Sequence, residues 1–325
     1  MPNPVLVEVT RAALVESVHR GAVAVAHAGG EIRFALGDVE MPVYPRSSLK
    51  PIQALPLIES GAADAFELSD EEVALACASH SGEPMHVRRV EAWLDRIGCG
   101  ETDLACGRQA PRYEPALEAM LRAGEKPTRL HNNCSGKHTG FLTLAKHLKA
   151  RAAGYVDVAH PVQKAVVGCL TRLSGVADPA WGVDGCAAPN FAVPLAAFAR
   201  ALAQIAGRRT PGAGRILRSM IAHPELVAGT GRSCTALMRA AHGKAAVKIG
   251  AEGVYAAMLP ELGLGIALKI DDGAARAAET AIAAVLERLG AIDGPSGLVR
   301  TPVTNTRGDT VGERRPAEAL MELRA

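Results

Sequence analysis

Two serines and a lysine stand close together in the stretch RSSLKP, residues 46–51, in front of a run with helical character. Ser47 and Lys50 are spaced S-x-x-K, and side chains three positions apart share one face of a helix. A serine hydroxyl becomes a nucleophile when a base takes its proton, and a lysine is such a base where burial or a second cation lowers its pKa from ~10.4. The alternative is that Ser47 only begins the helix, since serine is a favoured N-cap. The spacing alone leaves both interpretations open.

A second lysine stands in VKIGAEG, residues 247–253, which reads as a strand ending in a glycine-rich turn. Lys248 is either solvated or placed on an edge strand that lines a cleft. In the second case Gly250, which has no side chain, lets a substrate approach the backbone closely.

The stretch CASHSGE, residues 77–83, follows a predicted helix and carries Ser79 and Ser81. Taken by itself, it is an ordinary serine-rich loop. If it lies beside Ser47 and Lys50, Ser79 supplies a second hydroxyl to the same site.

Two further loops, HNNCSGKHTG at residues 131–140 and WGVDGCAAPN at residues 181–190, contain glycine, asparagine and one cysteine each. The first is not a phosphate-binding loop, because His131 and His138 stand where G-x-x-x-x-G-K-[ST] needs a glycine and a hydroxyl. Cys134 and Cys186 match no zinc-ligand spacing. By residue type alone, both loops are turns with a small buried cysteine.

The elements that must position these residues change character along the chain, from strands to helices and back. The expected strands are residues 5–10, 22–27, 31–36, 245–250, 253–259 and 265–270, with a hairpin turn at residues 28–30. The expected helices are residues 84–98, 114–124, 140–150, 161–175, 194–207 and 274–290. Ser69 and Glu72 form a capping box that opens one more helix.

The arrangement that buries both patterns is an α/β fold of the α+β kind, with one antiparallel sheet from both chain ends, flanked by helices, and an inserted helical lobe. We expect a single domain over residues 1–325, with the sheet lobe at about 1–45 and 241–325 and the helical lobe at about 46–240. A hairpin, an S-x-x-K helix, a helical lobe and a K-x-G strand, in this order, resemble the serine β-lactamase and penicillin-binding fold. The S-x-N motif of that superfamily is not evident, and Ile249 replaces a usual hydroxyl, which argues against antibiotic binding.

Composition and charge exclude several classes of partner. With 48% hydrophobic residues, the 325-residue chain can bury a large core, and its formal net charge of +2 includes no block of like charge suited to nucleic acid. No apolar run approaches the ~18 residues of a membrane span, and the first residues do not read as a signal peptide. We therefore expect a soluble, cytoplasmic protein without nucleic-acid or membrane partners. Seven cysteines without a C-x-x-C pair predict free, mostly buried thiols.

Taken together, RSSLKP, CASHSGE, HNNCSGKHTG, VDGCAAPNFAVPL and VKIGAEGVY resemble the Rhizobium-type L-asparaginases, also called asparaginase II. The resemblance spans about residues 5 to 315. It implies the serine β-lactamase and glutaminase-like fold, hydrolysis of L-asparagine to L-aspartate and ammonia, and commonly a homodimer. It also implies two serine–lysine pairs, Ser47 with Lys50 and Ser79 with Lys248.

The same resemblance implies a zinc ion near the substrate pocket, held by Cys134, Lys137 and Cys186, with Asp184 close by. A lysine amine binds zinc only when it is deprotonated. We expect the zinc ion to order the substrate pocket without generating the nucleophile. Asp184 is our candidate for binding the substrate α-ammonium group, and Arg46 for binding its α-carboxylate.

In this interpretation Lys50 takes the Ser47 proton, Ser47 attacks the side-chain carboxamide, and water hydrolyses the resulting acyl-enzyme, with backbone N–H groups at the oxyanion. Ser79 is the alternative nucleophile. Two rival functions stay open. One is a related amidohydrolase such as a glutaminase, since one methylene group discriminates by only ~1–3 kcal/mol. The other is a non-catalytic zinc or amino-acid binding protein on the same scaffold.

Overall fold

The computed structural model describes residues 2–293 and 297–322, and the chain divides into two compact units. The sheet unit comprises Met1–Ser48, Ala192–Arg209 and Ala236–Ala325. The helical unit comprises Leu49–Phe191 and Thr210–Thr235. Each unit is discontinuous in sequence, so its core is assembled from distant parts of the chain.

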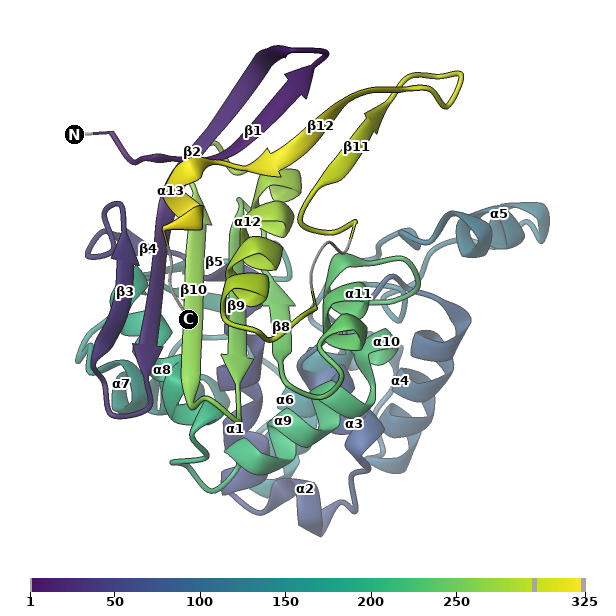
Figure 1. Ribbon diagram of the computed structural model, residues 1–325. Coiled ribbons are helices and arrows are strands. Elements are labelled where there is room, and N and C mark those ends of the chain that lie inside the picture. The colour runs from purple at the N-terminus through teal and green to yellow at the C-terminus, as the bar shows by residue number, and fades with distance from the viewer. Residues whose placement is uncertain (1, 294–296, 323–325) are drawn as a thin grey trace. The chain divides into compact units, whose positions relative to one another are not determined.

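The sheet unit contains an eight-stranded sheet in which all neighbouring strands are antiparallel. The strands are β1 (Val5–Arg11), β2 (Leu14–His27), β3 (Ile32–Leu36), β8 (Ala246–Ile249), β9 (Val254–Leu259), β10 (Leu264–Ile270), β11 (Thr301–Thr304) and β12 (Thr310–Pro316). Their order is β11-β12-β1-β2-β10-β9-β8, and β3 pairs with β2 (Figure 1). The predicted antiparallel sheet from both chain ends is therefore confirmed.

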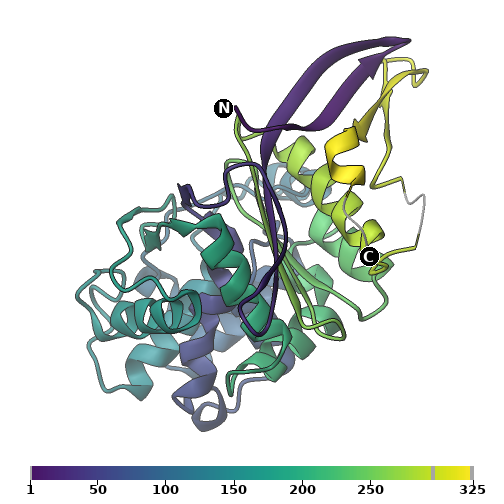
Figure 2. The same cartoon turned by 60° about the vertical axis from the view of Figure 1, so that its left-hand side comes forward.

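Helices cover both faces of the central strands. Figure 2 shows α12 (Ala275–Arg288) on one face and α8 (Leu195–Ala206) on the other. Burial on both faces explains why β9 is buried along its whole length and why β10 is buried at every position except Lys269. The remaining elements of this unit are β4 (Pro42–Val43), which pairs with β7 (Val193–Pro194), and α13 (Glu318–Met321).

One glycine sets how closely α8 approaches the sheet. A Cβ atom added to Gly265 in β10 would lie 2.1 Å from the backbone nitrogen of Ala203 and 2.3 Å from the carbonyl oxygen of Ala199. Both neighbours are helix backbone, which cannot move aside as a flexible side chain can. Gly265 therefore permits backbone-to-backbone packing between α8 and β10.

The helical unit consists of helices packed on one another and one short two-stranded ribbon. The helices are α1 (Lys50–Glu59), α2 (Ala62–Ala65), α3 (Asp70–Ala76), α4 (Pro84–Arg96), η2 (Glu101–Asp103), α5 (Glu114–Arg122), α6 (Ser135–His147), α7 (Pro161–Ser174), α9 (Ala213–Ala222) and α10 (Pro224–Val227). The ribbon pairs β5 (Trp181–Val183) with β6 (Pro189–Phe191). Two elements, η1 (Arg46–Leu49) and α11 (Ser233–Ala240), join the two units.

Most predicted elements are confirmed, and the differences have local causes. The capping box of Ser69 and Glu72 opens α3 as predicted. Helix α6 begins at Ser135, five residues before its predicted start at 140, because Gly136 and Gly140 lie inside the helix and do not interrupt it. Strand β2 begins at Leu14, well before residue 22, because its first half pairs with β1. Strands β11 and β12 were not predicted, since they lack a clear apolar alternation.

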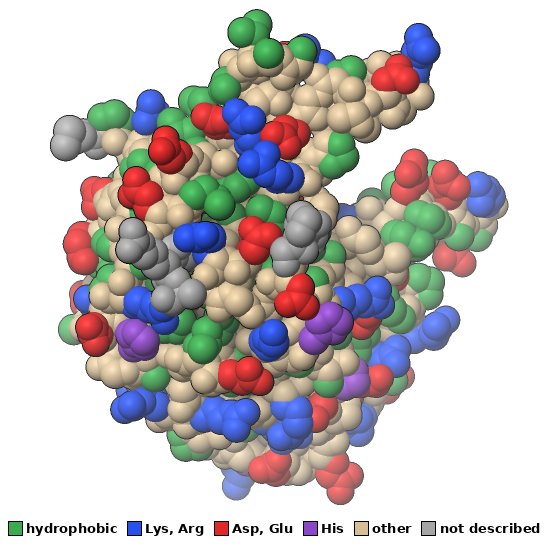
Figure 3. All heavy atoms as spheres, in the orientation of Figure 1, with side chains coloured by type: hydrophobic (Ala, Val, Ile, Leu, Met, Phe, Trp, Pro, Cys, Tyr) green, Lys and Arg blue, Asp and Glu red, His purple; other side chains and the backbone are tan. Residues whose placement is uncertain are grey.

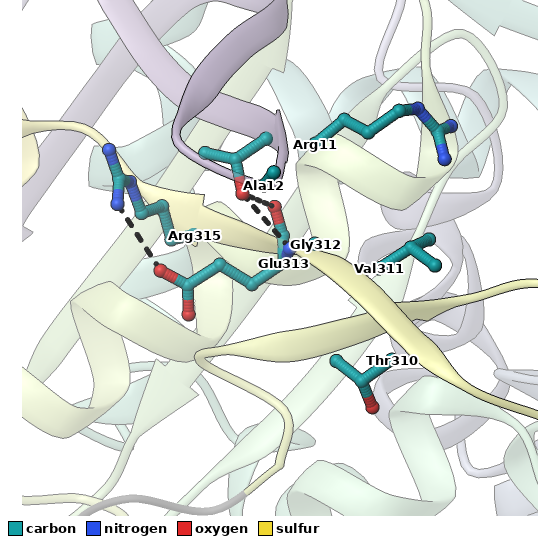
Figure 4. A pocket seen from close by; sticks show the side chains of 8 residues that line it. Arg11, Ala12, Thr310, Val311, Gly312, Glu313 and Arg315 are labelled. Atoms are coloured by element: carbon teal, nitrogen blue, oxygen red, sulfur yellow. Dashed lines mark hydrogen bonds and ion pairs between the residues drawn. The ribbon is translucent and has the colours of Figure 1, made fainter.

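The surface of the sheet unit includes an open groove at the end of β1. Thr10, Arg11 and Ala12 line it together with five residues of β12 (Figure 4). A Cβ atom on Gly312 would lie 2.0 Å from the Thr10 carbonyl oxygen, so this glycine brings β12 against β1. The groove contains none of the predicted site residues.

Acidic and basic side chains are interspersed over the face drawn in Figure 3. Within the described residues, every helix is too short or too polar to span a lipid bilayer.

We expect Gly265→Ala to lower the free energy of unfolding by about 1–3 kcal/mol, because the added methyl group overlaps the backbone of α8. Gly168→Ala in α7 is the matched control, since no atom lies within 4 Å of its added Cβ and alanine favours a helix by up to about 1 kcal/mol. Equilibrium urea denaturation measures both changes. Equal stability of the two variants would contradict the proposed role of Gly265.

Candidate active site

The predicted site residues belong to both units. Arg46, Ser47 and Lys248 lie in the sheet unit, and Lys50, Ser79, Cys134, Lys137, Asp184 and Cys186 lie in the helical unit. The chain passes from one unit to the other between Ser48 and Leu49, inside RSSLKP.

The first serine of RSSLKP does not cap a helix. Ser47 is half-buried in the 3₁₀ turn η1, and α1 follows directly from Lys50. The N-cap of α1 is Leu49, whose side chain accepts no hydrogen bond, so the interpretation of Ser47 as a simple helix cap is wrong. Before it, Arg46 adopts a left-handed backbone with a φ of 53°, and its Nη1 lies 3.9 Å from Glu252 Oε1.

Within the sheet unit, the end of β8 lies against the backbone beside Ser47. A Cβ atom on Gly250 would be 2.5 Å from the Pro45 carbonyl oxygen and 3.3 Å from the Ser48 nitrogen. The close neighbour of this glycine is thus the chain's own backbone. Lys248 lies on the edge strand β8 and is 1% exposed, and its Nζ donates to the Ile249 carbonyl oxygen at 2.9 Å. The solvated interpretation of Lys248 is therefore wrong.

Within the helical unit, the amine of Lys50 meets three acceptors. Its Nζ lies 3.0 Å from Ser79 Oγ and 3.1 Å from Cys134 Sγ, and it donates to the Ala78 carbonyl oxygen. Lys50 is 1% exposed and Ser79 is 5% exposed. The structure therefore brings together the lysine of RSSLKP, the first serine of CASHSGE and the cysteine of HNNCSGKHTG.

Close packing of two helices explains this meeting point. Ser79 follows the end of α3, and its backbone N–H donates to the Val227 carbonyl oxygen at 2.9 Å. Cys134 is the N-cap of α6. A Cβ atom on Gly136 would lie 2.5 Å from the Leu75 carbonyl oxygen, so only glycine lets the start of α6 approach α3 this closely.

The start of α6 also places Lys137 beside a second cysteine. Lys137 Nζ donates to Cys186 Sγ at 2.9 Å, and Lys137 is 3% exposed. Cys186 lies in the turn between β5 and β6 and, like Cys134, is 5% exposed. All seven cysteines are free thiols, as predicted.

Cys134, Lys137 and Cys186 influence one another electrostatically and form a cysteine–lysine cluster. The Cys134 thiol donates to Asn133 Oδ1 at 2.8 Å. Its contact with Cys186 and the charge of Lys137 lower the pKa of Cys186, whereas the same contact and burial raise the pKa of Cys134. Burial disfavours the Lys137 ammonium, yet the charges of Cys186 and Cys134 outweigh it and raise the pKa of Lys137. These shifts favour a Cys186 thiolate paired with the Lys137 ammonium.

The chemistry of this donor set fits a zinc ion. Cysteine thiolates and histidine nitrogens are usual zinc ligands in proteins, and a deprotonated lysine amine is a nitrogen donor of another kind. Lys137 Nζ and Cys186 Sγ lie 2.9 Å apart, and Lys137 must release its proton when it binds a metal. Among the described residues, no three His, Cys, Asp or Glu side chains are grouped to hold a metal, so a site here requires the lysine.

Asp184 lies in the same β5–β6 turn and is half-buried. Its Oδ1 accepts a hydrogen bond from the Gly185 backbone N–H at 2.7 Å. The negative charge of Asp184 also contributes to the raised pKa of Lys137. Asp184, the predicted partner of the substrate ammonium group, therefore lies close to the cysteine–lysine cluster.

A buried histidine that was not among the predicted site residues lies directly after Lys137. His138 Nδ1 is hydrogen-bonded to the Tyr155 hydroxyl at 2.7 Å, and this hydroxyl also accepts from the Ala105 backbone N–H at 2.8 Å. Burial lowers the pKa of His138 to about 4, so the ring is neutral. In the sequence His138 only excluded a phosphate loop, although its position directly after Lys137 was a usable signal.

Three comparisons relate the chain to known proteins. The family model described as L-asparaginase II matches residues 7–316. The comparison with curated proteins gave no match.

Solved structures similar to the chain include Mglu in its glutamate form, with a TM-score of 0.40 and 16% identity over 86% of this chain and 63% of that chain. Mglu in its native form has a TM-score of 0.40 and 16% identity over 91% and 71% of the two chains. A β-lactamase from Mycobacterium bovis has a TM-score of 0.34 and 14% identity over 82% and 93%. The chain thus spans less than two thirds of the length of the first of these proteins.

The family match extends from β1 to the last residue of β12. It includes all the predicted site residues described above, namely Arg46, Ser47, Lys50, Ser79, Cys134, Lys137, Asp184, Cys186 and Lys248. The chain belongs to the L-asparaginase II family.

Proposed function

We propose that the protein hydrolyses L-asparagine to L-aspartate and ammonia with a serine nucleophile that Lys50 activates. The observation that carries this proposal is the contact of 3.0 Å between the buried Lys50 amine and the Ser79 hydroxyl. An amine held against a hydroxyl away from water is suited to accept and return protons during acyl transfer. Membership of the L-asparaginase II family supports an amide substrate.

Ser47 is our proposed nucleophile. Its side chain is half-buried and so more accessible than Ser79, which is 5% exposed with its Oγ on Lys50. Ser47 Oγ attacks the side-chain carbonyl carbon of asparagine while its proton passes to the Lys50 amine. The proton then goes to the leaving nitrogen, the C–N bond breaks, and ammonia departs from an aspartyl ester. The same amine then takes a proton from water as the water oxygen attacks the ester carbonyl carbon, and it gives this proton to Ser47 Oγ as the ester C–O bond breaks and aspartate leaves.

Backbone and charged groups would bind the rest of the substrate. The Ser47 backbone N–H is a proposed donor to the oxyanion of the tetrahedral intermediate. We assign the α-ammonium group to Asp184 and the α-carboxylate to Arg46, because charge-assisted hydrogen bonds are the strong ones. Lys248 stays a proposed catalytic residue, since an amine that is 1% exposed on an edge strand is held at a desolvation cost that a function would explain.

Cys134, Lys137 and Cys186 would hold the proposed zinc ion. Zinc supplies a fixed positive charge when bound and orders the residues around it. The contribution of the chain is to bring Lys137 within 2.9 Å of Cys186 and to keep Cys186 as a thiolate. In our proposal this group orders the substrate pocket, and the nucleophile is activated separately by Lys50.

Two alternatives make different demands on these residues. A glutaminase would use the same serine and lysine and differ only in the depth of its substrate pocket. A zinc-binding protein would need the cysteine–lysine cluster, but it would not need a buried lysine amine in contact with a serine hydroxyl. The Lys50–Ser79 contact therefore favours an enzyme.

Replacing Lys50 with methionine should lower kcat for asparagine at least about 10²-fold, because the proton acceptor is lost while the buried aliphatic volume is kept. Ammonia release at saturating asparagine measures the effect. Lys146→Met, which removes a partly exposed lysine of the same unit, should leave kcat unchanged. Full activity in Lys50→Met would exclude Lys50 as the base.

Two serine substitutions decide which hydroxyl carries the acyl group. We expect Ser47→Ala to lower kcat by at least about 10³-fold and to form no aspartyl ester. Ser79→Ala should be slower but still form the ester, and so should the control Ser48→Ala, whose buried Oγ donates to Pro45. Intact-protein mass spectrometry after acid quenching detects the ester. An ester that survives in Ser47→Ala and disappears in Ser79→Ala would assign the nucleophile to Ser79.

Cys186→Ser tests the proposed zinc ion with least effect on the base, because Cys186 contacts Lys137 whereas Cys134 also contacts Lys50. We expect the zinc content to fall below one tenth of the wild-type value and KM for asparagine to rise more than kcat falls. Plasma mass spectrometry and steady-state kinetics measure these quantities. Loss of zinc with unchanged KM and kcat would show that the metal does not order the pocket.

A further inference from the structure

A buried histidine connects the Ser79 segment to the Cys134 segment. His80 directly follows Ser79, and its side chain is fully buried. Its Nε2 lies 2.9 Å from Ser135 Oγ, and its Nδ1 lies 3.1 Å from the Gly82 backbone nitrogen. Both ring nitrogens are therefore engaged within the helical unit.

The hydrogen-bond partners fix the tautomer of His80. The Gly82 backbone N–H can only donate, so Nδ1 must accept and Nε2 must carry the ring proton. Nε2–H then donates to Ser135 Oγ, whose own proton goes to the Leu130 carbonyl oxygen at 2.9 Å. Burial, together with the neighbouring His86, lowers the pKa of His80, which agrees with a neutral ring.

The same residue makes a second connection to the Cys134 segment. The His80 backbone N–H donates to the Asn133 carbonyl oxygen at 3.1 Å, so His80 binds residues on both sides of Cys134. On the other side, Lys50 Nζ contacts both Ser79 Oγ and Cys134 Sγ. Together these contacts close a ring that runs from Lys50 through Ser79 and His80 to the Cys134 segment and back.

We propose that His80 is a positioning residue, which fixes the separation of Ser79 Oγ and Cys134 Sγ so that the single amine of Lys50 reaches both. In this way the His80 imidazole couples the Lys50–Ser79 pair to the cysteine–lysine cluster. This inference rests on the proposed function and adds a specific role for a histidine that is not one of the proposed substrate or zinc ligands.

His86 provides a matched comparison. Its ring stacks on that of His80, with centroids 4.8 Å apart and an angle of 10° between the planes, and it is equally buried. Its nitrogens bond to the Glu83 backbone N–H at 3.1 Å and to the Glu225 carbonyl oxygen at 2.9 Å. His86 therefore shares the packing of His80 without its bonds to the Cys134 segment.

The test compares His80→Leu, His80→Gln and His86→Leu in the full-length protein. The measurements are kcat and KM for asparagine, the Zn²⁺ dissociation constant by competition with a chelator, and Tm. We expect His80→Leu to lower kcat and to weaken Zn²⁺ binding, each at least tenfold, with a smaller change in KM. His80→Gln, whose amide can still donate to Ser135 Oγ, should recover most of both losses. His86→Leu should lower Tm to a similar extent but change kcat and Zn²⁺ affinity less than threefold.

Equal effects of His80→Leu and His86→Leu on kcat and Zn²⁺ affinity would overturn the proposal, since they would show a packing role only. If His80→Leu does not fold, Ser135→Ala removes the same hydrogen bond at the small partner, and unchanged kcat and Zn²⁺ affinity in that variant would equally overturn it. A wild-type protein that hydrolyses no asparagine would refute the proposed function, and the Zn²⁺ affinities would then decide the role of His80. A wild-type protein that binds no Zn²⁺ would leave that decision to kcat.

Discussion

The burial of one lysine amine is the constraint on which the helical unit's site depends. An amine removed from water must find acceptors inside the protein, and Lys50 finds them on three segments of the chain. The start of α1 carries the lysine, the residues after α3 supply a carbonyl and a hydroxyl, and the start of α6 supplies a thiol. The contacts that satisfy this amine are therefore the same contacts that assemble the candidate catalytic group.

A second group of charges lies next to the first and is balanced in a different way. Lys137 donates to Cys186 Sγ at 2.9 Å, and its positive charge compensates the negative charge that the lowered pKa of Cys186 favours at this buried position. Cys134 belongs to both groups, because its sulfur accepts from Lys50 at 3.1 Å and its contact with Cys186 shifts the pKa of both thiols. A change in the cysteine–lysine cluster, such as metal binding, would therefore alter the surroundings of Lys50 through Cys134. The close packing of α6 on α3 at Gly136 allows Cys134 to occupy this shared position.

Much of the fold could be predicted because its patterns are local. The hairpin, β8 to β10, the capping box at Ser69 and the amphipathic helices all follow from residue spacing and turn chemistry. Strand β12 could not, since TVGERRP becomes a strand only through its partner β1. The same limit applies to the site. The motifs marked Ser47, Ser79 and Cys134 as candidates, but the Lys50–Ser79 contact and the bonds of His80 depend on which loop ends meet in space.

The pairing of β1 with β12 also constrains how the protein is made. Val7 pairs with Pro316, and β2 pairs with β10, so the sheet joins residues from opposite ends of the chain. During synthesis the helical unit's residues leave the ribosome before β8, β9 and β10 exist. The hairpin of β1 and β2 therefore lacks its partners β10 and β12, and its apolar side chains stay uncovered, until these strands have been synthesised. Such long-range pairing makes folding slow, and the waiting hairpin is the segment that a chaperone would need to protect.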